Sequence, residues 1–382
     1  MKKQLLPLFL AVSLLLSGCS WPNGSYVSVT PHRKPKQNVQ ATVISADDYL
    51  DLIDVLVELI ASGTESAAID VSSYPANAVK SGMAVAIRYA MENDPVGAYA
   101  VEEIHYEQGS SGGQPAVAVQ ILYRHNRNQI RQIYSLQKME DAEAMVAQAL
   151  ANYDSGVVML VEEYSQKDFQ QFAEDYAEEN PQLVMELPQV VAGTYGTGKS
   201  RVLELNFTYK NARDDLRQMQ NQVKPVFDSA TLYVSGDGSD YQKYSQLYAF
   251  LMERFDYTLE TSITPTYSLL RHGVGDSRAF AVVYAAMCRT ADLECAVVTG
   301  TKSGEPWSWN MVMDNGRYYH VDLLGSNLTG RFTEMTDAQM HGYVWDYSAY
   351  PECTDHIQVE SPAADIGQTQ PMEAGEESTG AE

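Results

Sequence analysis

The stretch GDSRAFAVVYAAMCRTADLECAVVTG, residues 275–300, decides the fold of the C-terminal half of this 382-residue chain. Its apolar residues recur at helical spacing, which predicts a helix over Ser277–Ala291. The apolar face of that helix would consist of Phe280, Val283, Tyr284, Met287, Cys288 and Ala291. A short apolar strand is expected to follow at Cys295–Thr299.

Two further strands and an earlier helix extend this pattern over residues 225–350. Trp309–Asp314 and Arg317–Leu323 are expected strands, because Asn315-Gly316 between them is a strong hairpin signal. The apolar spacing before the central helix predicts another helix from about Tyr241 to Phe255. The sequence therefore predicts an α+β unit in this region.

Four segments of this unit, in their order, resemble the core of bacterial transglutaminase-like domains. They are Gly275–Phe280, Glu294–Gly300, Trp307–Val312 and Tyr318–Asp322. The resemblance implies a papain-like fold with a Cys-His-Asp triad. In that family the Cys begins a buried helix, and the His and Asp lie on neighbouring strands.

The resemblance places unexpected residues at two of the three triad positions. The Cys position falls on Ser277, the His position on Trp307 and the Asp position on Asp322. Ser308-Trp309-Asn310 keep the register of the family's His-Ala-Trp-Asn segment, so no shift of frame restores the triad. A serine hydroxyl needs an adjacent base to become a nucleophile, and an indole can only donate a hydrogen bond. We therefore interpret these three residues as a degenerate, catalytically inactive triad.

The hairpin register predicts the surroundings of the triad positions. Continued from Asn315-Gly316, it sets Trp309 opposite Asp322 and Trp307 on the diagonal. We expect the two indoles to fill the cleft that a substrate acyl group would use, with Asn310 beside it.

Two histidines keep an alternative open, in which Ser277 is the nucleophile of an acyl-transfer or amide-hydrolysing enzyme. His272 lies five residues before Ser277, and His320 lies two residues before Asp322. A loop histidine is more often solvated and a strand histidine is more often packed, so we expect neither to serve as the base.

The cysteines favour no metal or disulfide framework. Four cysteines are too few and too scattered for a stapled scaffold or a CxxC zinc site. Cys288 and Cys295 are expected to be buried thiols, and Cys353 has no evident partner. We predict neither a metal nor a cofactor.

A pattern upstream recurs at a constant offset of 86 residues, which favours a duplication. The matched positions are Tyr123-Arg124, Arg127 and Ile130–Ile133 against Tyr209-Lys210, Arg213 and Leu216–Met219. Each copy is predicted to run helix, strand, helix, hairpin, helix. The predicted fold class is α+β: tandem α+β repeat units at residues 45–138 and 139–224, followed by a papain-like, transglutaminase-like domain at 225–350.

Gly193–Ser200 satisfies the pattern G-x-x-x-x-G-K-[ST] of a phosphate-binding loop. Such a loop holds phosphate at the start of a helix, but the alternating pattern of Arg201–Tyr209 predicts a strand. The matching segment of the first copy, Gly109–Gly113, lacks the lysine and predicts a hairpin turn. We expect no nucleotide to bind here.

The N-terminus predicts export and lipid attachment. The apolar run Leu5–Leu16 follows two lysines; it is too short to span a bilayer but typical of a secretion signal. Leu16–Cys19 resembles the lipobox of bacterial lipoproteins, which implies that residues 1–18 are a signal peptide and that Cys19 carries a lipid. Residues 19–44 would then be a tether, and residues 351–382 an acidic, disordered tail.

The net charge of the chain indicates which kinds of partner it can bind. The chain has 26 Lys+Arg against 50 Asp+Glu, and the resulting net charge of −24 repels phosphate backbones, which argues against a nucleic-acid partner. We therefore expect an extracytoplasmic protein, anchored to the bacterial membrane by its N-terminal lipid, whose C-terminal domain binds or scaffolds. A further hypothesis assigns the binding of a wall fragment or a partner protein to the repeat units.

Overall fold

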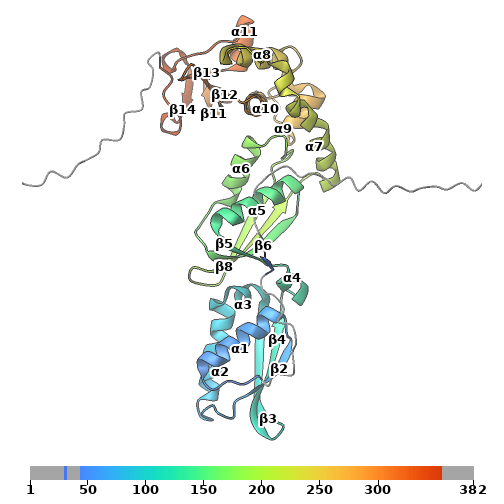
Figure 1. Ribbon diagram of the computed structural model, residues 1–382, viewed down its shortest axis with the longest axis vertical. Coiled ribbons are helices and arrows are strands. Elements are labelled where there is room, and N and C mark those ends of the chain that lie inside the picture. The colour runs from blue at the N-terminus through green and yellow to red at the C-terminus, as the bar shows by residue number, and fades with distance from the viewer. Residues whose placement is uncertain (1–29, 32–43, 355–382) are drawn as a thin grey trace, which may run out of the picture. The chain divides into compact units, whose positions relative to one another are not determined.

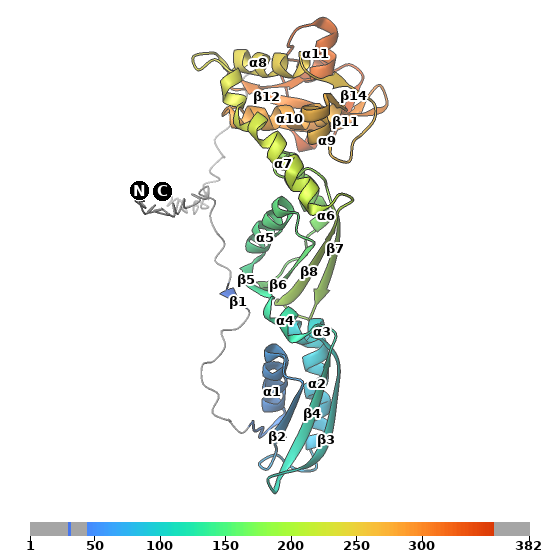
Figure 2. The ribbon, with the colours of Figure 1, turned by 90° about the vertical axis from the view of Figure 1, so that its right-hand side faces the viewer.

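The computed structural model describes residues 30–31 and 44–354. The predicted signal peptide, Cys19, most of the tether and most of the acidic tail lie outside the described residues. The chain divides into two compact units (Figure 1 and Figure 2). One comprises the residues up to 146 with 157–167 and 192–205, and the other comprises 147–156, 168–191 and the residues from 206 onward.

The first unit begins with helices on one side of a three-stranded sheet (Figure 1). Helix α1 (Tyr49–Ser62) starts at Asp48, whose side chain accepts hydrogen bonds from two N–H groups of the first turn, and it ends at Gly63 in the left-handed conformation. The antiparallel sheet has the order β2-β4-β3. Its strands and the accompanying helices are β2 (Ser66–Asp70), β3 (Val101–Ser111), β4 (Gln114–Tyr123), α2 (Val79–Arg88), the π-helix η1 (Tyr89–Asn93), α3 (Pro95–Ala100) and α4 (Arg127–Arg131).

A second sheet has five strands in the order β1-β5-β6-β8-β7. Strands β5 and β6 run parallel, whereas β1 and β5 run antiparallel. The strands are β1 (Thr30–Pro31), β5 (Tyr134–Lys138), β6 (Gly156–Glu163), β7 (Gln189–Tyr195) and β8 (Arg201–Thr208). Three helices alternate with these strands along the chain: α5 (Met139–Asn152) precedes β6, α6 (Phe169–Glu179) follows β6, and α7 (Arg213–Asp228) follows β8.

The two halves of residues 49–228 follow the same order of elements. The strand order is β2-β4-β3 in the first half and β6-β8-β7 in the second, and α4 and α7 begin at Arg127 and Arg213. The expected turn between β3 and β4 is present, with Gly112 and Gly113 at positive φ. Helix α7 runs to Asp228 and includes Pro225, so the predicted boundary at residue 224 falls inside a helix. A duplication of the sequence itself stays a prediction.

The segment Gly193–Ser200 comprises the end of β7 and the loop of residues 196–200, and it is followed by strand β8, as the sequence predicted, and not by a helix. The loop packs on residues 93–95 of the first unit. Asn93 Nδ2 donates to Thr197 Oγ1 at 2.7 Å, and the Thr197 N–H donates to the Asn93 carbonyl at 3.2 Å. A Cβ at Gly196, which has φ +88°, would lie 2.7 Å from the Cα of Pro95. The glycine therefore permits a close backbone contact, which is a structural role for the loop.

The second unit contains a four-stranded antiparallel sheet in the order β13-β12-β11-β14. Its strands are β11 (Cys295–Lys302), β12 (Glu305–Asp314), β13 (Arg317–Val321) and β14 (Tyr343–Trp345). The short pair β9 (Asp256–Tyr257) and β10 (Val274–Gly275) is parallel. The helices are α8 (Asp240–Met252), α9 (Pro265–Tyr267), α10 (Ser277–Thr290) and α11 (Leu323–Thr329), with short turns η2 (Ala230–Tyr233), η3 (Ser268–His272), η4 (Asp337–Gln339) and η5 (Tyr347–Ala349).

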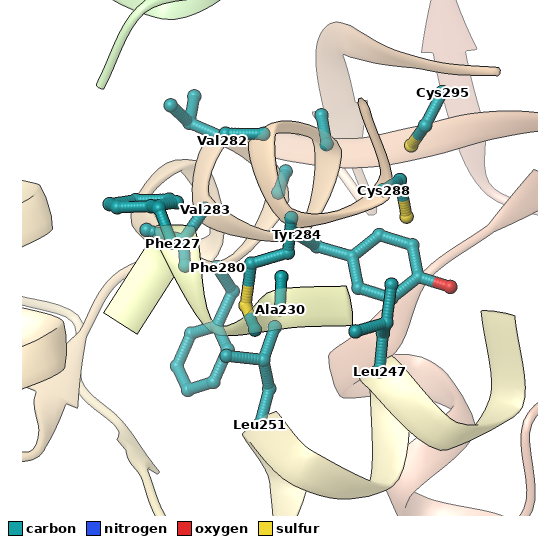
Figure 3. Close-up of a cluster of buried hydrophobic side chains, with 14 of the residues drawn as sticks. Phe227, Ala230, Leu247, Leu251, Phe280, Val282, Val283, Tyr284, Cys288 and Cys295 are labelled. Atoms are coloured by element: carbon teal, nitrogen blue, oxygen red, sulfur yellow. The ribbon is translucent and has the colours of Figure 1, made fainter. Parts of the chain in front are cut away.

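Helix α10 lies at the centre of the core of the second unit (Figure 3). Phe280, Val283 and Tyr284 are at most 1% exposed and pack among Phe227, Leu247 and Leu251. The Tyr284 hydroxyl donates to the Tyr244 carbonyl at 2.9 Å. Cys288, Cys295 and Cys353 are buried free thiols, which confirms the prediction for the first two, and burial raises the pKa of the Cys288 thiol.

Several predicted bounds need correction. Strand β11 continues to Lys302, past the predicted end at Thr299. Strand β12 begins at Glu305, so Trp307 lies on the strand and not before it. Strand β13 ends at Val321 and not at Leu323, because Asp322 leaves the strand to cap α11. Helix α8 ends at Met252, three residues before the predicted Phe255. Within residues 44–354, no helix combines the length and the apolar character that crossing a membrane requires.

Candidate functional site

Ser277 is the first residue of α10. Asp276 caps the helix, with its Oδ1 accepting the N–H of Ala279 at 2.8 Å and its Oδ2 accepting the Thr261 hydroxyl at 2.7 Å. The Ser277 side chain is buried, and its Oγ accepts a hydrogen bond from the backbone N–H of Ser308 on β12 at 3.2 Å. This bond joins the start of the buried helix to the sheet.

Asp322 lies directly after β13 and caps α11 through the N–H of Leu324, which donates to Oδ1 at 3.1 Å. Its other oxygen, Oδ2, accepts from Lys302 Nζ at 2.7 Å, from Trp307 Nε1 at 3.1 Å and from the Tyr343 hydroxyl at 2.5 Å. The Asp322 side chain is 1% exposed, so these donors replace the water that a carboxylate otherwise requires. Burial, and then the charge of Asp322, raise the pKa of the Tyr343 hydroxyl.

Trp307 brings an indole N–H to the Asp322 carboxylate. The Lys302 ammonium lies 4.8 Å from the centre of the Trp307 ring, within the range of a cation–π contact. The Tyr257 ring lies 5.5 Å away, centre to centre. Trp307 is thus held by a hydrogen bond and by two ring contacts.

Trp309 follows the predicted register, since Asn310 pairs with Val321 and Asp322 is the next residue. Its indole N–H donates to His320 Nδ1 at 3.0 Å, and its ring packs edge-on against Trp345 at 5.7 Å. Of the two indoles, Trp307 is the one that bonds Asp322.

Asn310 connects the sheet to α10. Its Nδ2 donates to the carbonyl of Ala281 at 2.8 Å and to that of Ala296 at 3.3 Å, and the side chain is fully buried. We assign it a positioning role, because it fixes β12 against the helix that carries Ser277.

The space between these elements is too narrow for a water molecule. It is lined by Ser277, Phe280, Ala281, Ser308, Trp309, Asn310, Asp322, Leu323 and Leu324. An acyl group could therefore approach the Ser277 hydroxyl only after side chains move.

The two histidines that were considered as a base for Ser277 make their described contacts with other residues. His272 is exposed, and its ring packs edge-on against Tyr267 at 5.1 Å. His320 is fully buried, as expected of a packed strand histidine, and bonds Trp309 and Asp337.

Sequence reasoning missed Lys302 and Tyr343. Lys302 ends β11 and Tyr343 begins β14, and these two residues pair across the antiparallel strands. Both then reach Asp322. No local pattern marks them, since their role arises from strand pairing between distant segments.

Residues 229–323 match the family described as the Transglutaminase-like superfamily. No curated protein matches the chain. Among solved structures, the chain is similar to one described as a TGase, with 10% identity and a TM-score of 0.25, over 57% of this chain and 63% of that one. The chain thus spans less than two thirds of that protein.

A second solved structure that is similar to the chain is a proposed cysteine protease from Cytophaga hutchinsonii. Its identity is 13% and its TM-score 0.25, over 41% of this chain and 70% of that one. The predicted α+β class is confirmed. The chain carries a transglutaminase-like domain on residues 229–323.

Proposed function

We propose that the transglutaminase-like domain binds or scaffolds at the cell surface without catalysing acyl transfer or amide hydrolysis. The observation that carries this proposal is the hydrogen bond from the Trp307 indole N–H to Asp322 Oδ2 at 3.1 Å. A catalytic histidine would bond such a carboxylate through one nitrogen and accept the proton of the nucleophile at the other. An indole supplies the donor and has no acceptor.

The surroundings of Ser277 support the same proposal. Its Oγ accepts a backbone N–H, and the adjoining space excludes water. A positioned base contributes about 10²- to 10⁴-fold to rate, and a serine hydroxyl is a weak nucleophile without one. The described hydrogen bond of Ser277 Oγ supplies neither contribution, which supports the proposal.

The proposal is tested by turnover of the chain lacking residues 1–19. The purified protein is incubated with a glutamine-containing peptide and a fluorescent amine, and separately with the peptide alone, beside the variant Ser277→Ala. We expect both proteins to match the buffer control in amine incorporation and in ammonia release. Turnover that Ser277→Ala abolishes would support the alternative, in which Ser277 is the nucleophile of an acyl-transfer or amide-hydrolysing enzyme.

A binding role also predicts what happens in cells. A strain that lacks the gene is complemented with the wild type, with Ser277→Ala, or with a chain that ends at residue 224. Wild type and Ser277→Ala should reverse the defect of the deletion strain equally, because the proposed binding role does not use the Ser277 hydroxyl. The chain that ends at residue 224 should not reverse the defect. Complementation by the chain that ends at residue 224 would instead assign the function to the N-terminal units.

We further propose that a lipid on Cys19 anchors the chain to the outer face of the bacterial membrane. Support comes from the apolar run Leu5–Leu16 and the lipobox-like Leu16–Cys19. Cells fed a radiolabelled fatty acid should incorporate label into the wild type and not into Cys19→Ala, which should leave the membrane fraction. Equal labelling of the two proteins would refute the anchor.

A further inference from the structure

Three side chains outside the Ser277 site lie close together: His320, Asp337 and Cys353. Their nitrogen, oxygen and sulfur atoms lie within 4.8 Å of one another. His320 and Cys353 are buried, at 0% and 1% exposure, and Asp337 is partly buried. Such a set could hold a metal ion or could form a hydrogen-bonded network, and the two possibilities differ in where the imidazole carries its proton.

The indole of Trp309 decides between them. It donates to His320 Nδ1 at 3.0 Å, and because an indole cannot accept, Nδ1 must present its lone pair. The proton of the neutral imidazole therefore lies on Nε2, which is 2.9 Å from Asp337 Oδ1 and donates to it. A metal at Nε2 would need the lone pair that this proton occupies. The geometry thus favours a hydrogen-bonded network.

This network fastens a long C-terminal segment. Asp337 Oδ2 accepts the N–H of Cys353 at 3.2 Å, and the Asp337 N–H donates to the Cys353 carbonyl at 2.9 Å. Strand β14 lies between these two residues in the sequence; its Trp345 packs edge-on against the His320 ring at 4.7 Å. The same strand supplies the Tyr343 hydroxyl that bonds Asp322. The His320–Asp337 contact therefore helps to hold Tyr343 at the Ser277 site.

We propose that His320 is an acid-sensitive latch for β14, in which protonation of Nδ1 breaks the hydrogen bond from Trp309 and loosens the contacts of the Trp309 ring with Tyr343 and Trp345. The bond from Nε2–H to Asp337 is kept. The step consists of the uptake of one proton from solvent. Protonated imidazole carries N–H groups at both nitrogens, so Nδ1–H would face the Trp309 N–H, and two donors cannot bond. The latch works in the same way whether or not Ser277 is reactive.

The groups around His320 act in opposite directions: burial and the Trp309 N–H disfavour the protonated ring, whereas Asp337 favours it. Asp337 is the charged partner among its described contacts, the Cys353 thiol is the other titratable group nearby, and the indoles of Trp309 and Trp345 are neutral. Burial lowers the pKa of His320 from its usual value, and the hydrogen bond to Asp337 offsets part of that shift. The latch is therefore fully closed above pH about 6.5 and weakens as the pH falls below it.

The test is hydrogen exchange of the amides in β14 of the full ectodomain between pH 5 and pH 8. After correction for the intrinsic exchange rate, the opening constant should be flat above pH 7 and should rise as the pH falls below about 6.5, by at most about tenfold per pH unit. In His320→Gln the constant should be independent of pH, even if the substitution raises its absolute value. His341→Gln removes an exposed histidine of the same segment and should keep the wild-type slope.

Two results would overturn the latch. The first is a wild-type opening constant that does not change with pH, or a slope that persists in His320→Gln. The second is a rise in β14 protection on addition of Zn²⁺ that Cys353→Ser abolishes, since that would identify a metal centre. We expect Zn²⁺ and EDTA to leave the protection of the wild type unchanged, and ¹⁵N NMR at pH 7.5 to show His320 as the Nε2–H tautomer.

Discussion

Asp322 has a full set of hydrogen-bond donors, one of which is the indole of Trp307. Lys302, Trp307 and Tyr343 all donate to the same carboxylate oxygen. A buried carboxylate without such partners is costly, because it has lost its hydration. Trp307 thus helps to stabilise a buried charge, and Asp322 helps to hold the end of β11 and the start of β14 together.

If Ser277 and Trp307 hold the nucleophile and base positions, as we propose, a cysteine and a histidine at these positions should form a reactive pair. Ser277→Cys combined with Trp307→His should be alkylated by iodoacetamide at pH 6 at least about tenfold faster than Ser277→Cys alone, because a neighbouring imidazole favours the thiolate. Rates are read from intact mass. The matched control combines Ser277→Cys with Trp309→His, which places the imidazole on the residue that bonds His320 and should give no acceleration. Equal rates in all three proteins would show that Trp307 does not occupy the base position.

Glu334 predicts a pH dependence of stability. Burial raises the pKa of its carboxyl to about 7, and the charge of Asp314 contributes. Because the unfolded chain loses this proton at lower pH than the folded chain, the free energy of unfolding falls as the pH rises towards 7. Glu334→Gln removes the cost of burying a charged carboxylate, which the folded protein bears only at high pH. The variant should therefore be more stable than the wild type by about 1–2 kcal/mol at pH 8, after allowance for partial exposure, and by almost nothing at pH 4.5.

Thermal unfolding at the two pH values measures this effect. Glu260→Gln, at an exposed position, serves as the control and should match the wild type at both. A stabilisation by Glu334→Gln that is the same at pH 4.5 and pH 8 would contradict the account, since it would not arise from ionisation.

Among the elements, those with local signals were predictable from the sequence. The apolar spacing of Ser277–Thr290 gave α10 to within one residue of its observed end. Asn315 and Gly316 have φ of 50° and 74°, which these two residue types tolerate, so the turn and the register that follows from it were predictable. A strand after Gly193–Ser200 was predictable from its alternating pattern.

Elements that depend on distant contacts were not predictable. Strand β13 stops at Val321 because Asp322 turns to cap α11, and the apolar pattern alone continues to Leu323. The three residues of β14 carry no periodicity of their own and form a strand by pairing with β11. The carboxylate partners Lys302 and Tyr343 depend on that pairing and so were missed.

The glycine-rich loop gives a prediction at this scale. Gly196→Ala should destabilise the protein by about 2 kcal/mol more than Gly198→Ala, because both glycines have positive φ but only Gly196 would bring a Cβ against Pro95. Chemical denaturation measures the difference. Lys199→Ala should cost less than about 0.5 kcal/mol, since the lysine side chain is exposed. Equal costs for the two glycine variants would contradict the packing role of the loop.

At the scale of the whole molecule, the core of the transglutaminase-like domain includes residues that precede it in the sequence. Leu216 and Val223 of α7 are fully buried and belong to the cluster around α10. Arg278 and Arg289 of α10 also contact Glu178 and Glu179, at 3.1 Å and 2.7 Å. The family match at residues 229–323 therefore does not include the complete core of the domain.

Fragments that differ only in α7 test this point. A fragment of residues 225–354 should be about 4 kcal/mol less stable than one of residues 210–354, because it lacks two fully buried side chains. Thermal unfolding followed by circular dichroism compares them under identical conditions. Equal melting temperatures would mean that α7 does not belong to this core.

The most direct test of the central claim is intact-mass spectrometry of the ectodomain after incubation with an activated acyl ester and with a fluorophosphonate. The account predicts no adduct on Ser277 in wild-type protein at any pH from 5 to 9, and therefore mass spectra that match those of Ser277→Ala. The account would be contradicted by an acyl or phosphonyl adduct that forms on native protein, maps to Ser277 and disappears in Ser277→Ala. Such an adduct would mean that a neighbouring base activates the Ser277 hydroxyl.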